Sequence, residues 1–547
     1  MTIGDRALEA RDWWTPANPR NFYRRSNASP FVYGLALPAP LSLVIWRSKF
    51  HFGAMEDRRD VLAKLGLLGL GFASPAQSEE LPTGARTNVR KRSVMEFGAC
   101  GDGLTDDTEA FNAATEANKP WKEGLSDAIT VPAGRYRVNG TIHLRKGQHL
   151  VGEGEATVID ASGAHGTTLT MGTDARGRPD PGGAPVGVNG LRFLGGTGTA
   201  PVVSVKAEGF SLSRLFFSAA GTAIEISGAD GILSEITIDQ ALRGLVFSSA
   251  QNIIVQGLIS YLANFAVTLG NASSDILISQ AVIAYSRYAS VLFAEGVRGI
   301  QSVRFSNCDF VSNESYREFL GHVHIRSDAC DAQFSACTFR NHPGFAVREV
   351  AGSSATLTFD NCIFDGSPSR EVYNKSVSAG GLLTGASSRF HLSGCHFRNL
   401  ENPVIRVGPY LKRLVLSGGS IQNCTGDPLQ FDPRAGGQTI VRGVDGFGRR
   451  NQDGSFVLPW RGIATGWRVT ARATDGSGAI AVCECTVLRQ KAEQIIAVYP
   501  SPASALPLVA AFGDSPGGPQ RAPAQDQGLL CLSAERSDLE WTAETLA

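Results

Sequence analysis

A six-residue motif recurs ten times between residues 188 and 421, and it constrains the fold more than any other feature of the chain. Its template is an apolar residue, two small or polar residues, an apolar residue or cysteine, any residue, and another apolar residue. The clearest copies lie at 305–310 (FSNCDF), 334–339 (FSACTF), 359–364 (FDNCIF) and 392–397 (LSGCHF). Weaker copies lie at 188–193, 212–217, 233–238, 255–260, 278–283 and 416–421.

The copies are spaced 21 to 33 residues apart. Strand-like alternation at such a period predicts a solenoid. One repeat is too short to bury a core by itself, so stacked neighbours must share one. A second apolar alternation follows in most periods, at 223–226, 266–269, 290–293, 322–326, 346–348 and 404–407.

Residues 188–421 show no helical periodicity, and Gly, Ser, Asn and Asp fill the gaps between strands as turns require. The pattern therefore predicts an all-β parallel β-helix. A leucine-rich repeat has a similar period, but its regular Leu/Asn signature is absent, and a propeller blade needs about forty residues.

Four cysteines occupy the fourth motif position in adjacent repeats: Cys308, Cys337, Cys362 and Cys395. Because free Cys packs as a small buried hydrophobe, we expect them to form an inward ladder. Disulfides between neighbouring coils are the alternative, since strand spacing lies near the bridgeable range. No CxxC pair accompanies these residues, so no metal site is expected.

The N-terminal region carries a twin arginine, Arg58-Arg59, then a short apolar stretch and small residues up to Ala76. This order predicts a signal peptide at 55–76 of the twin-arginine type, because the apolar part is too short to span a membrane. The alternative is an ordinary helix after a basic turn. Residues 1–54 are interpreted as a non-native or disordered lead, so the mature chain begins near Gln77. The prediction is export to the periplasm or beyond, with the twin-arginine translocation machinery as a partner.

Composition excludes some classes of function. Formal net charge is zero and charged residues make up 19% of the chain, so no basic stripe of the nucleic-acid-binding type is present. The 547 residues suit one long solenoid with a small terminal module better than several globular domains.

Three spaced motifs precede the repeats: VMEFGACGDGLTDDTEAF at 94–111, ITVPAGRY at 129–136 and LVGEG at 150–154. Together they resemble the N-terminal cap of the pectate-lyase-like superfamily, of the rhamnogalacturonase/epimerase type. The whole chain resembles the twin-arginine-translocated repeat proteins of bacteria. The resemblance covers roughly residues 58–425. It implies a right-handed parallel β-helix at 90–425 with its cap at 93–154, followed by a C-terminal β region at 427–547.

The cap also has a physical basis. Asp106 is placed as the N-cap of a helix from Asp107 to about Ala117, and Glu109 completes a capping box. Such a helix would bury Phe111 and cover the end of the solenoid. The acidic residues here do not have the spacing of an EF-hand, so we expect a structural role.

Fold alone does not determine function, because the superfamily includes hydrolases, lyases, epimerases and non-catalytic binders. The carboxylate motifs of polygalacturonases and of alginate epimerases are absent from the chain. Asp309, Asp360 and Asp365 are candidate carboxylates in a loose sense only.

The strand at 322–326 predicts an outward polar stripe, with Val323 and Ile325 facing in. The predicted catalytic residues are His324, Arg348, Arg326 and Tyr316, and the predicted substrate-binding residues are His322, Arg317, Glu349 and Arg406. Arg holds carboxylates in bidentate fashion, and His or Tyr can remove the proton α to a uronate carboxyl group. No cofactor is expected.

Three functional hypotheses follow. The first is an exported β-helix protein that acts on or binds an acidic polysaccharide, as a lyase or hydrolase if it is catalytic. The second is a non-catalytic structural or adhesive solenoid of the envelope, and the third is a depolymerase like those of phage tailspikes. After Cys424 the repeat fades, and we expect a few strands that cover the end of the solenoid, with 533–547 frayed or a short helix.

Overall fold

The computed structural model describes residues 92–118 and 128–442, except 175–177, 179–183, 197, 297–298, 313–317, 351–352, 367–369, 373–374, 378, 385–387, 410, 426–427 and 432–437. Beyond residue 442 it describes Val444 and the backbone of the strands between Arg449 and Leu546. The predicted signal peptide and the lead before it lie outside the described residues.

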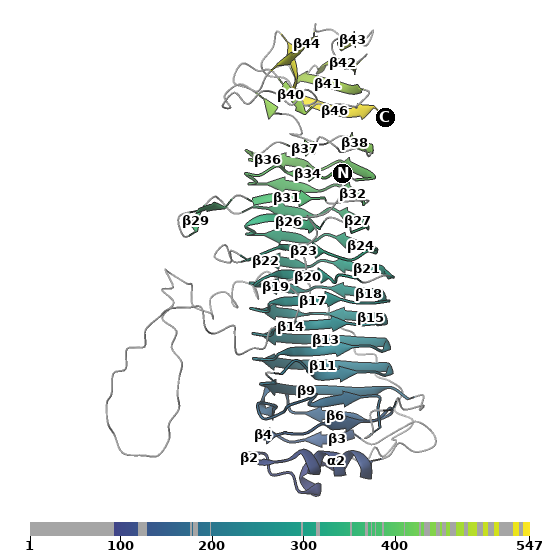
Figure 1. The fold of residues 1–547 in the computed structure, drawn as a ribbon, viewed down its shortest axis with the longest axis vertical. Helices are drawn as coiled ribbons and strands as arrows, with labels where there is room; N and C mark the ends of the chain where they lie inside the picture. Colours follow the sequence, from purple (N-terminus) through teal and green to yellow (C-terminus); the bar gives the residue numbers. More distant parts are fainter. Residues whose placement is uncertain are drawn as a thin grey trace, which may run out of the picture. The chain divides into compact units, whose positions relative to one another are not determined.

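Within the described residues, the repeats form a right-handed parallel β-helix, as the motif predicts (Figure 1). Successive coils stack by parallel pairing in three ladders. The first ladder contains β1 (Arg92–Ser93), β3 (Ala128–Val131), β6 (His149–Gly152), β15 (Gln251–Gln256), β18 (Ser274–Ser279), β21 (Ile300–Ser306), β24 (Cys330–Ser335), β27 (Ala355–Asp360), β32 (Arg389–Ser393), β35 (Arg413–Ser417) and β38 (Gln438–Arg442).

The second ladder contains β2 (Asp102–Asp106), β4 (Gly134–Arg137), β7 (Thr157–Asp160), β16 (Ile259–Tyr261), β19 (Val282–Ala284), β22 (Asp309–Val311), β25 (Thr338–Arg340), β28 (Ile363–Asp365), β33 (His396–Arg398) and β36 (Ser420–Gln422). Three long strands run through both ladders: β9 (Val186–Leu194), β11 (Glu208–Ser218) and β13 (Ala229–Asp239).

The third ladder contains β5 (Ile142–Leu144), β8 (Leu169–Met171), β10 (Pro201–Val205), β12 (Thr222–Ile226), β14 (Arg243–Phe247), β17 (Phe265–Leu269), β20 (Ala289–Phe293), β23 (Gly321–Ile325), β26 (Gly344–Glu349), β31 (Ala379–Leu383), β34 (Ile405–Val407) and β37 (Leu429–Phe431). An antiparallel hairpin of β29 (Arg370–Val372) and β30 (Lys375–Val377) interrupts the coil between β28 and β31.

The motif marks the corner between the first and second ladders. Its third residue adopts a left-handed backbone, with φ between 51° and 55° at Arg214, Glu235, Gln280, Asn307, Ala336 and Asn361. Gly257, Gly394 and Gly418 hold the same position in other coils. Small, polar or glycine residues suit this position because a Cβ atom crowds the backbone there.

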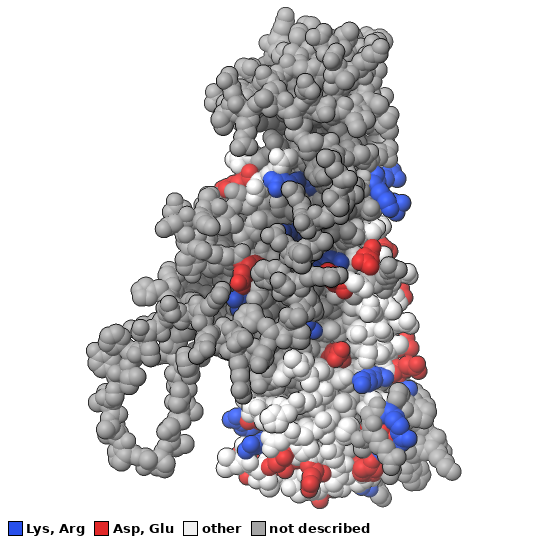
Figure 2. Space-filling model, in the orientation of Figure 1, with Lys and Arg blue, Asp and Glu red and all other residues white. Residues whose placement is uncertain are grey.

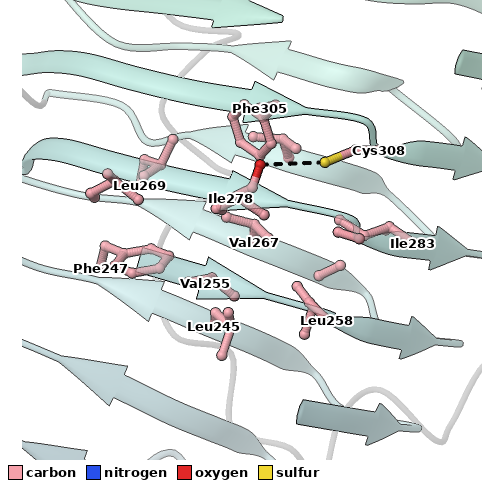
Figure 3. Close-up of a cluster of buried hydrophobic side chains, with 14 of the residues drawn as sticks. Leu245, Phe247, Val255, Leu258, Val267, Leu269, Ile278, Ile283, Phe305 and Cys308 are labelled. Carbon is pink, nitrogen blue, oxygen red and sulfur yellow. Dashed lines mark hydrogen bonds between the residues drawn. The ribbon is translucent and has the colours of Figure 1, made fainter. Parts of the chain in front are cut away.

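The first and sixth motif residues point inward and align from coil to coil. Phe310, Phe339, Phe364 and Phe397 form a continuous stack with ring centroids 4.8 to 4.9 Å apart. Phe305, Phe334 and Phe359 form a parallel stack at 4.8 and 4.9 Å. In neighbouring coils aliphatic residues such as Val255 and Ile283 fill the same interior (Figure 3).

The cysteine ladder is confirmed. All four thiols are buried, and each Sγ donates to a backbone carbonyl of the preceding coil, as Cys308 does to Ile278 at 3.5 Å (Figure 3). Every cysteine whose side chain the structure describes is a free thiol. The core-packing interpretation therefore holds over the disulfide alternative.

The N-terminal cap differs in detail from the prediction. The helix α2 spans Thr108–Ala117 with Asp107 at its N-cap, and it has no capping box. Asp106 instead accepts from the Thr108 hydroxyl, at 2.5 Å, and from Asn139, while Asp107 accepts from the backbone of Cys100. The carboxylates are thus used to join the helix to neighbouring loops, since a tight turn places them beside those donors. Phe111 is fully buried, as predicted.

Two short 3-10 helices complete this region, η2 (Val94–Phe97) and η3 (Gly154–Ala156). The capping box that the sequence placed on α2 is found on η2 instead, between Ser93 and Glu96.

The C-terminal residues form two antiparallel sheets. One contains β39 (Arg449–Arg450), β40 (Phe456–Pro459), β44 (Leu508–Gly513) and β45 (Leu529–Ala534). The other contains β41 (Gly466–Thr474), β42 (Ile480–Arg489), β43 (Ile496–Pro500) and β46 (Glu540–Leu546). The expectation of a frayed or helical end was wrong, because β46 pairs with β41 along its length.

Candidate functional site

Several predicted site residues meet on the outside of the third ladder. His324 on β23 is in register with Arg348 on β26, and Arg348 is in register with Leu383 and then Arg406. Gln430 on β37 continues the line. We call His324, Arg348, Leu383, Arg406 and Gln430 the outer row. The predicted proximity of His324 and Arg348 and the equivalent place of Arg406 are both observed.

His322 does not join this row, and its predicted outward orientation was wrong. It is fully buried. Its Nδ1 lies 3.1 Å from the Ser290 hydroxyl and its Nε2 lies 3.0 Å from the Arg340 carbonyl. The physical reason is that two successive residues face inward where each coil enters the third ladder. Residues at the position of His322 in other coils are buried as well, namely Ala223, Ala266, Ser290, Ala346 and Val404.

Glu349 also faces the interior, contrary to the prediction. Alternation along β26 makes Val347 and Glu349 inward neighbours on either side of Arg348, and Glu349 is buried. Its carboxylate accepts hydrogen bonds from the Ser353 hydroxyl, at 3.0 Å, and from the Ser388 hydroxyl. Glu349 therefore ties two turns of the solenoid together. Tyr316 and Arg317 lie outside the described residues.

His324 is held neutral by its surroundings. Its side chain is 4% exposed, and burial followed by the charges of Arg348 and Arg326 lowers its pKa to about 4. Its Nδ1 is buried without a hydrogen-bond partner in the described part of the chain. A neutral imidazole with an unused ring nitrogen is in the protonation state that a general base needs, and a pKa of about 4 makes it a weak base.

The arginines around His324 differ in their availability. Arg326 forms an ion pair with Glu295 in the preceding coil. Arg406 lies over the Phe345 ring at 5.3 Å and donates to Gln430 at 2.7 Å. Arg348 is exposed, and no ion pair involves it among the residues that the structure describes. An exposed guanidinium without a carboxylate partner can hold an anionic group of a ligand.

The second ladder carries a row of charges that the sequence interpretation missed. Arg340 pairs with Asp309, and Arg398 pairs with Asp365 with Nε and a terminal nitrogen both 2.8 Å from Oδ2. Asp360 on the first ladder accepts from Gln333 at 2.9 Å. These three carboxylates thus have structural partners. The sequence does carry a signal for this row, namely charged residues at the fifth position of the motif and directly after its sixth position. In Figure 2 acidic and basic side chains are interspersed on the described surface.

The described residues hold no group of three or more His, Cys, Asp or Glu side chains placed to bind a metal ion. Within the same residues, no helix has the length and apolar character needed to cross a bilayer.

Comparison with known families assigns the fold. Residues 91–287, a little more than a third of the chain, match the family model described as rhamnogalacturonase A/epimerase, pectate lyase-like. Over these residues the β-helix is of the pectate-lyase-like type. The match includes the cap and the first coils of this pectate-lyase-like β-helix, and it ends before β23.

Similarity to individual proteins is partial. A stretch of 74 residues is 35% identical to mannuronan C5-epimerase AlgE1 of Azotobacter vinelandii, and it spans 12% of this chain and 5% of that relative. The A-module of mannuronan C-5 epimerase AlgE4 from the same organism aligns with a TM-score of 0.45 and 14% identity, over 65% of this chain and 100% of the module. PfbA, a surface adhesin of Streptococcus pneumoniae, aligns with a TM-score of 0.42 and 14% identity, over 65% and 90%.

Proposed function

We propose that this protein binds an acidic polysaccharide along the outer row of the third ladder. The observation that carries the proposal is Arg348, an exposed guanidinium that no described carboxylate neutralises, with Arg406 two coils further along the same line. Guanidinium groups bind carboxylates with paired hydrogen bonds.

The geometry of the coils suits an extended ligand. Neighbouring parallel strands are about 4.8 Å apart, which places Arg348 and Arg406 roughly 10 Å apart at their backbones. A sugar unit in an extended chain is about as long as one coil is high. A glycan running across the coils would therefore present carboxylates of alternate units to the two arginines. The family match and the 74-residue likeness to an epimerase of a polyuronate add support.

Binding can be tested by calorimetric titration with polygalacturonate, using dextran as the neutral control. Arg348→Ala should weaken binding of polygalacturonate about ten-fold or more, because a hydrogen bond to a charged group contributes about 1.5–3 kcal/mol. Arg304→Ala removes an exposed arginine from the first ladder and is the matched control. Equal affinity of the Arg348 and Arg304 variants, or equal binding of dextran, would contradict the proposal.

A second candidate is proton abstraction, and the neutral His324 beside Arg348 favours it. His324 would take the proton from the carbon α to a uronate carboxyl group, and the electron pair would move onto that carboxylate, held by Arg348. The bond between the neighbouring carbon and its glycosidic oxygen then breaks as the carbon–carbon double bond forms, and the leaving oxygen takes a proton from solvent, as in a lyase. Without that cleavage, a proton delivered from solvent to the opposite face of the α carbon gives the epimer.

Three readouts on polygalacturonate and alginate separate the reactions. A lyase releases reducing ends with ultraviolet absorbance from the new double bond, and a hydrolase releases reducing ends alone. An epimerase incorporates deuterium at the α carbon in heavy water without cleavage. His324→Gln should abolish turnover and leave binding intact, whereas turnover that survives this change would exclude His324 as the base. Binding without turnover on either glycan corresponds to an adhesive solenoid.

We also propose export through the twin-arginine pathway, from the motif at Arg58 and Arg59. Residues 55–76 fused to a reporter should reach the periplasm of a bacterium. Replacing both arginines by lysine should retain the reporter inside the cell, and unchanged export would contradict the proposal.

A further inference from the structure

Four aromatic residues gather at the corner where the second ladder turns into the third. Tyr261 ends β16 and Phe265 begins β17 in one coil, while Tyr285 and Tyr288 occupy the corresponding corner of the next coil. All four side chains are partly exposed. We call these residues the aromatic corner. Most other aromatic side chains of the described solenoid are buried in its interior.

One half of the aromatic corner is a layered stack. The Phe265 and Tyr288 rings lie 5.5 Å apart with planes inclined by 30°, and the Arg287 guanidinium lies over Tyr288 at 5.2 Å. Glu318 pairs with Arg287 at 2.9 Å and also interacts with the Tyr288 hydroxyl. The stack therefore presents rings with a carboxylate at the rim, and its guanidinium is already neutralised.

The other half combines two phenols with a carboxylate. Tyr261 is in register with Asp239 of the preceding coil. Tyr261 is also in register with Ala284, the residue before Tyr285, in the next coil. Burial, then Tyr285 and Asp239, raises the pKa of Tyr261. Tyr285 adopts a left-handed backbone with φ of 59°, a conformation that bulky side chains seldom take. Here, too, the rim of the rings is acidic.

We propose that the aromatic corner is a subsite for a neutral pyranose unit, an inference that rests on the proposed function. Flat aromatic rings with hydroxyl rims offer an apolar face to the C–H side of a sugar and hydrogen bonds to its edge. Asp239 and Glu318 accept hydrogen bonds from sugar hydroxyls, but they repel a uronate carboxylate. The aromatic corner has no unpaired arginine like the one in the outer row, because its Arg287 is paired with Glu318.

The location of the aromatic corner connects it to the outer row. Phe265 is in register with Ala289, and Ala289 with Gly321 at the start of the strand that carries His324. A glycan that lies along the third ladder therefore passes from the aromatic corner to Arg348 within a few coils. The ligand class that fits both surfaces is a heteropolysaccharide in which neutral sugars accompany uronates.

The test compares two probes on the full chain by calorimetric titration. Polygalacturonate contains uronate alone, and gellan contains neutral sugars together with glucuronate. Tyr288→Ala should weaken gellan binding at least ten-fold and leave polygalacturonate binding unchanged, while Tyr288→Phe should have a smaller effect because it keeps the ring. Phe216→Ala, which removes an outward aromatic beneath Arg192 on the second ladder, is the matched control and should change neither affinity.

The outcomes separate this inference from the proposed function. Loss of polygalacturonate binding in Arg348→Ala tests the outer row and does not involve Tyr288. Unchanged gellan affinity in Tyr288→Ala, with that variant folded by circular dichroism, would overturn the aromatic subsite. An equal loss for both probes would also overturn it, because the corner would then bind uronate as the outer row does.

Discussion

Arg348 lies directly beside His324 in the next coil, and its positive charge helps to keep that imidazole neutral. Burial is the larger cause, and Arg326 contributes as well. Replacing Arg348 by methionine should therefore raise the pKa of His324 from about 4 part of the way toward its ordinary value near 6.5. Histidine NMR titrations of the two proteins measure this change. Arg406→Met, two coils further along, should leave the midpoint unchanged, and an equal shift in both variants would contradict the pairwise cause.

Buried histidines should make stability depend on pH. Burial lowers the pKa of His342 to about 4, against smaller opposing effects of the Gly380 carbonyl and Asp365. Burial, followed by the charge of His342, lowers the pKa of His322 as well. Below about pH 6.5 the unfolded chain binds protons that the native protein does not, so the free energy of unfolding falls. The loss is about 1.4 kcal/mol per pH unit for each histidine until its native pKa is reached.

Urea unfolding at pH 7 and pH 5 measures this loss. His342→Gln should flatten the dependence, whereas the control His165→Gln removes an exposed histidine and should not. Parallel pH profiles for the two variants would exclude His342 as a cause.

The phenylalanine stack should contribute strongly to stability. Phe339 lies 4.9 Å from Phe310 and 4.9 Å from Phe364, and it is fully buried. Phe339→Ala leaves a cavity between two coils and should cost about 3–5 kcal/mol in unfolding free energy, with Phe339→Leu costing less. The midpoint of urea unfolding measures the effect, with the exposed Thr356→Ala as a control. A loss below about 1 kcal/mol would mean that the coils repack around the gap.

Much of the fold could be predicted because a repeated position has the same environment in every coil. Cys308 and Phe310 belong to motif positions whose side chains all point inward, so the sequence period alone is enough to place them. The outward position of Arg348 follows from strand alternation in the same way.

The orientation of His322 and the hydrogen-bonded burial of Glu349 could not be predicted by the same reasoning. His322 follows Gly321 at a corner where two consecutive residues face in, and alternation assigns it to the wrong side. Glu349 is inward by alternation, but its burial depends on Ser388, which lies in a later coil. Pairs such as Arg340 and Asp309 join residues 31 positions apart, so they appear only when the exact register is known.

Glycine at the motif corner should stabilise the protein through its backbone conformation, although other coils carry larger residues there. Gly257 has φ of 71°, and the nearest atom to an added Cβ would lie 3.6 Å away, so a methyl group fits without a clash. The cost of Gly257→Ala is then that of the left-handed backbone, about 1–2 kcal/mol. Gly166→Ala is the matched control, since Gly166 has open space and no positive φ. Equal unfolding midpoints for the two variants would show that this corner tolerates a side chain.

The ladder cysteines should resist chemical modification in the folded protein. The thiolate is the reactive form, and the pKa of Cys337 is raised to about 12. Its hydrogen bond with Cys308 lowers this pKa, but the one with Cys362 and burial raise it by more. Cys100 is exposed and should react with iodoacetamide in the native state, whereas Cys337 and Cys362 should react only after unfolding in guanidinium. Mass spectrometry of the tagged peptides identifies the modified positions. Labelling of Cys337 as fast as Cys100, or a disulfide between Cys308 and Cys337, would show that the coils open enough to expose the ladder.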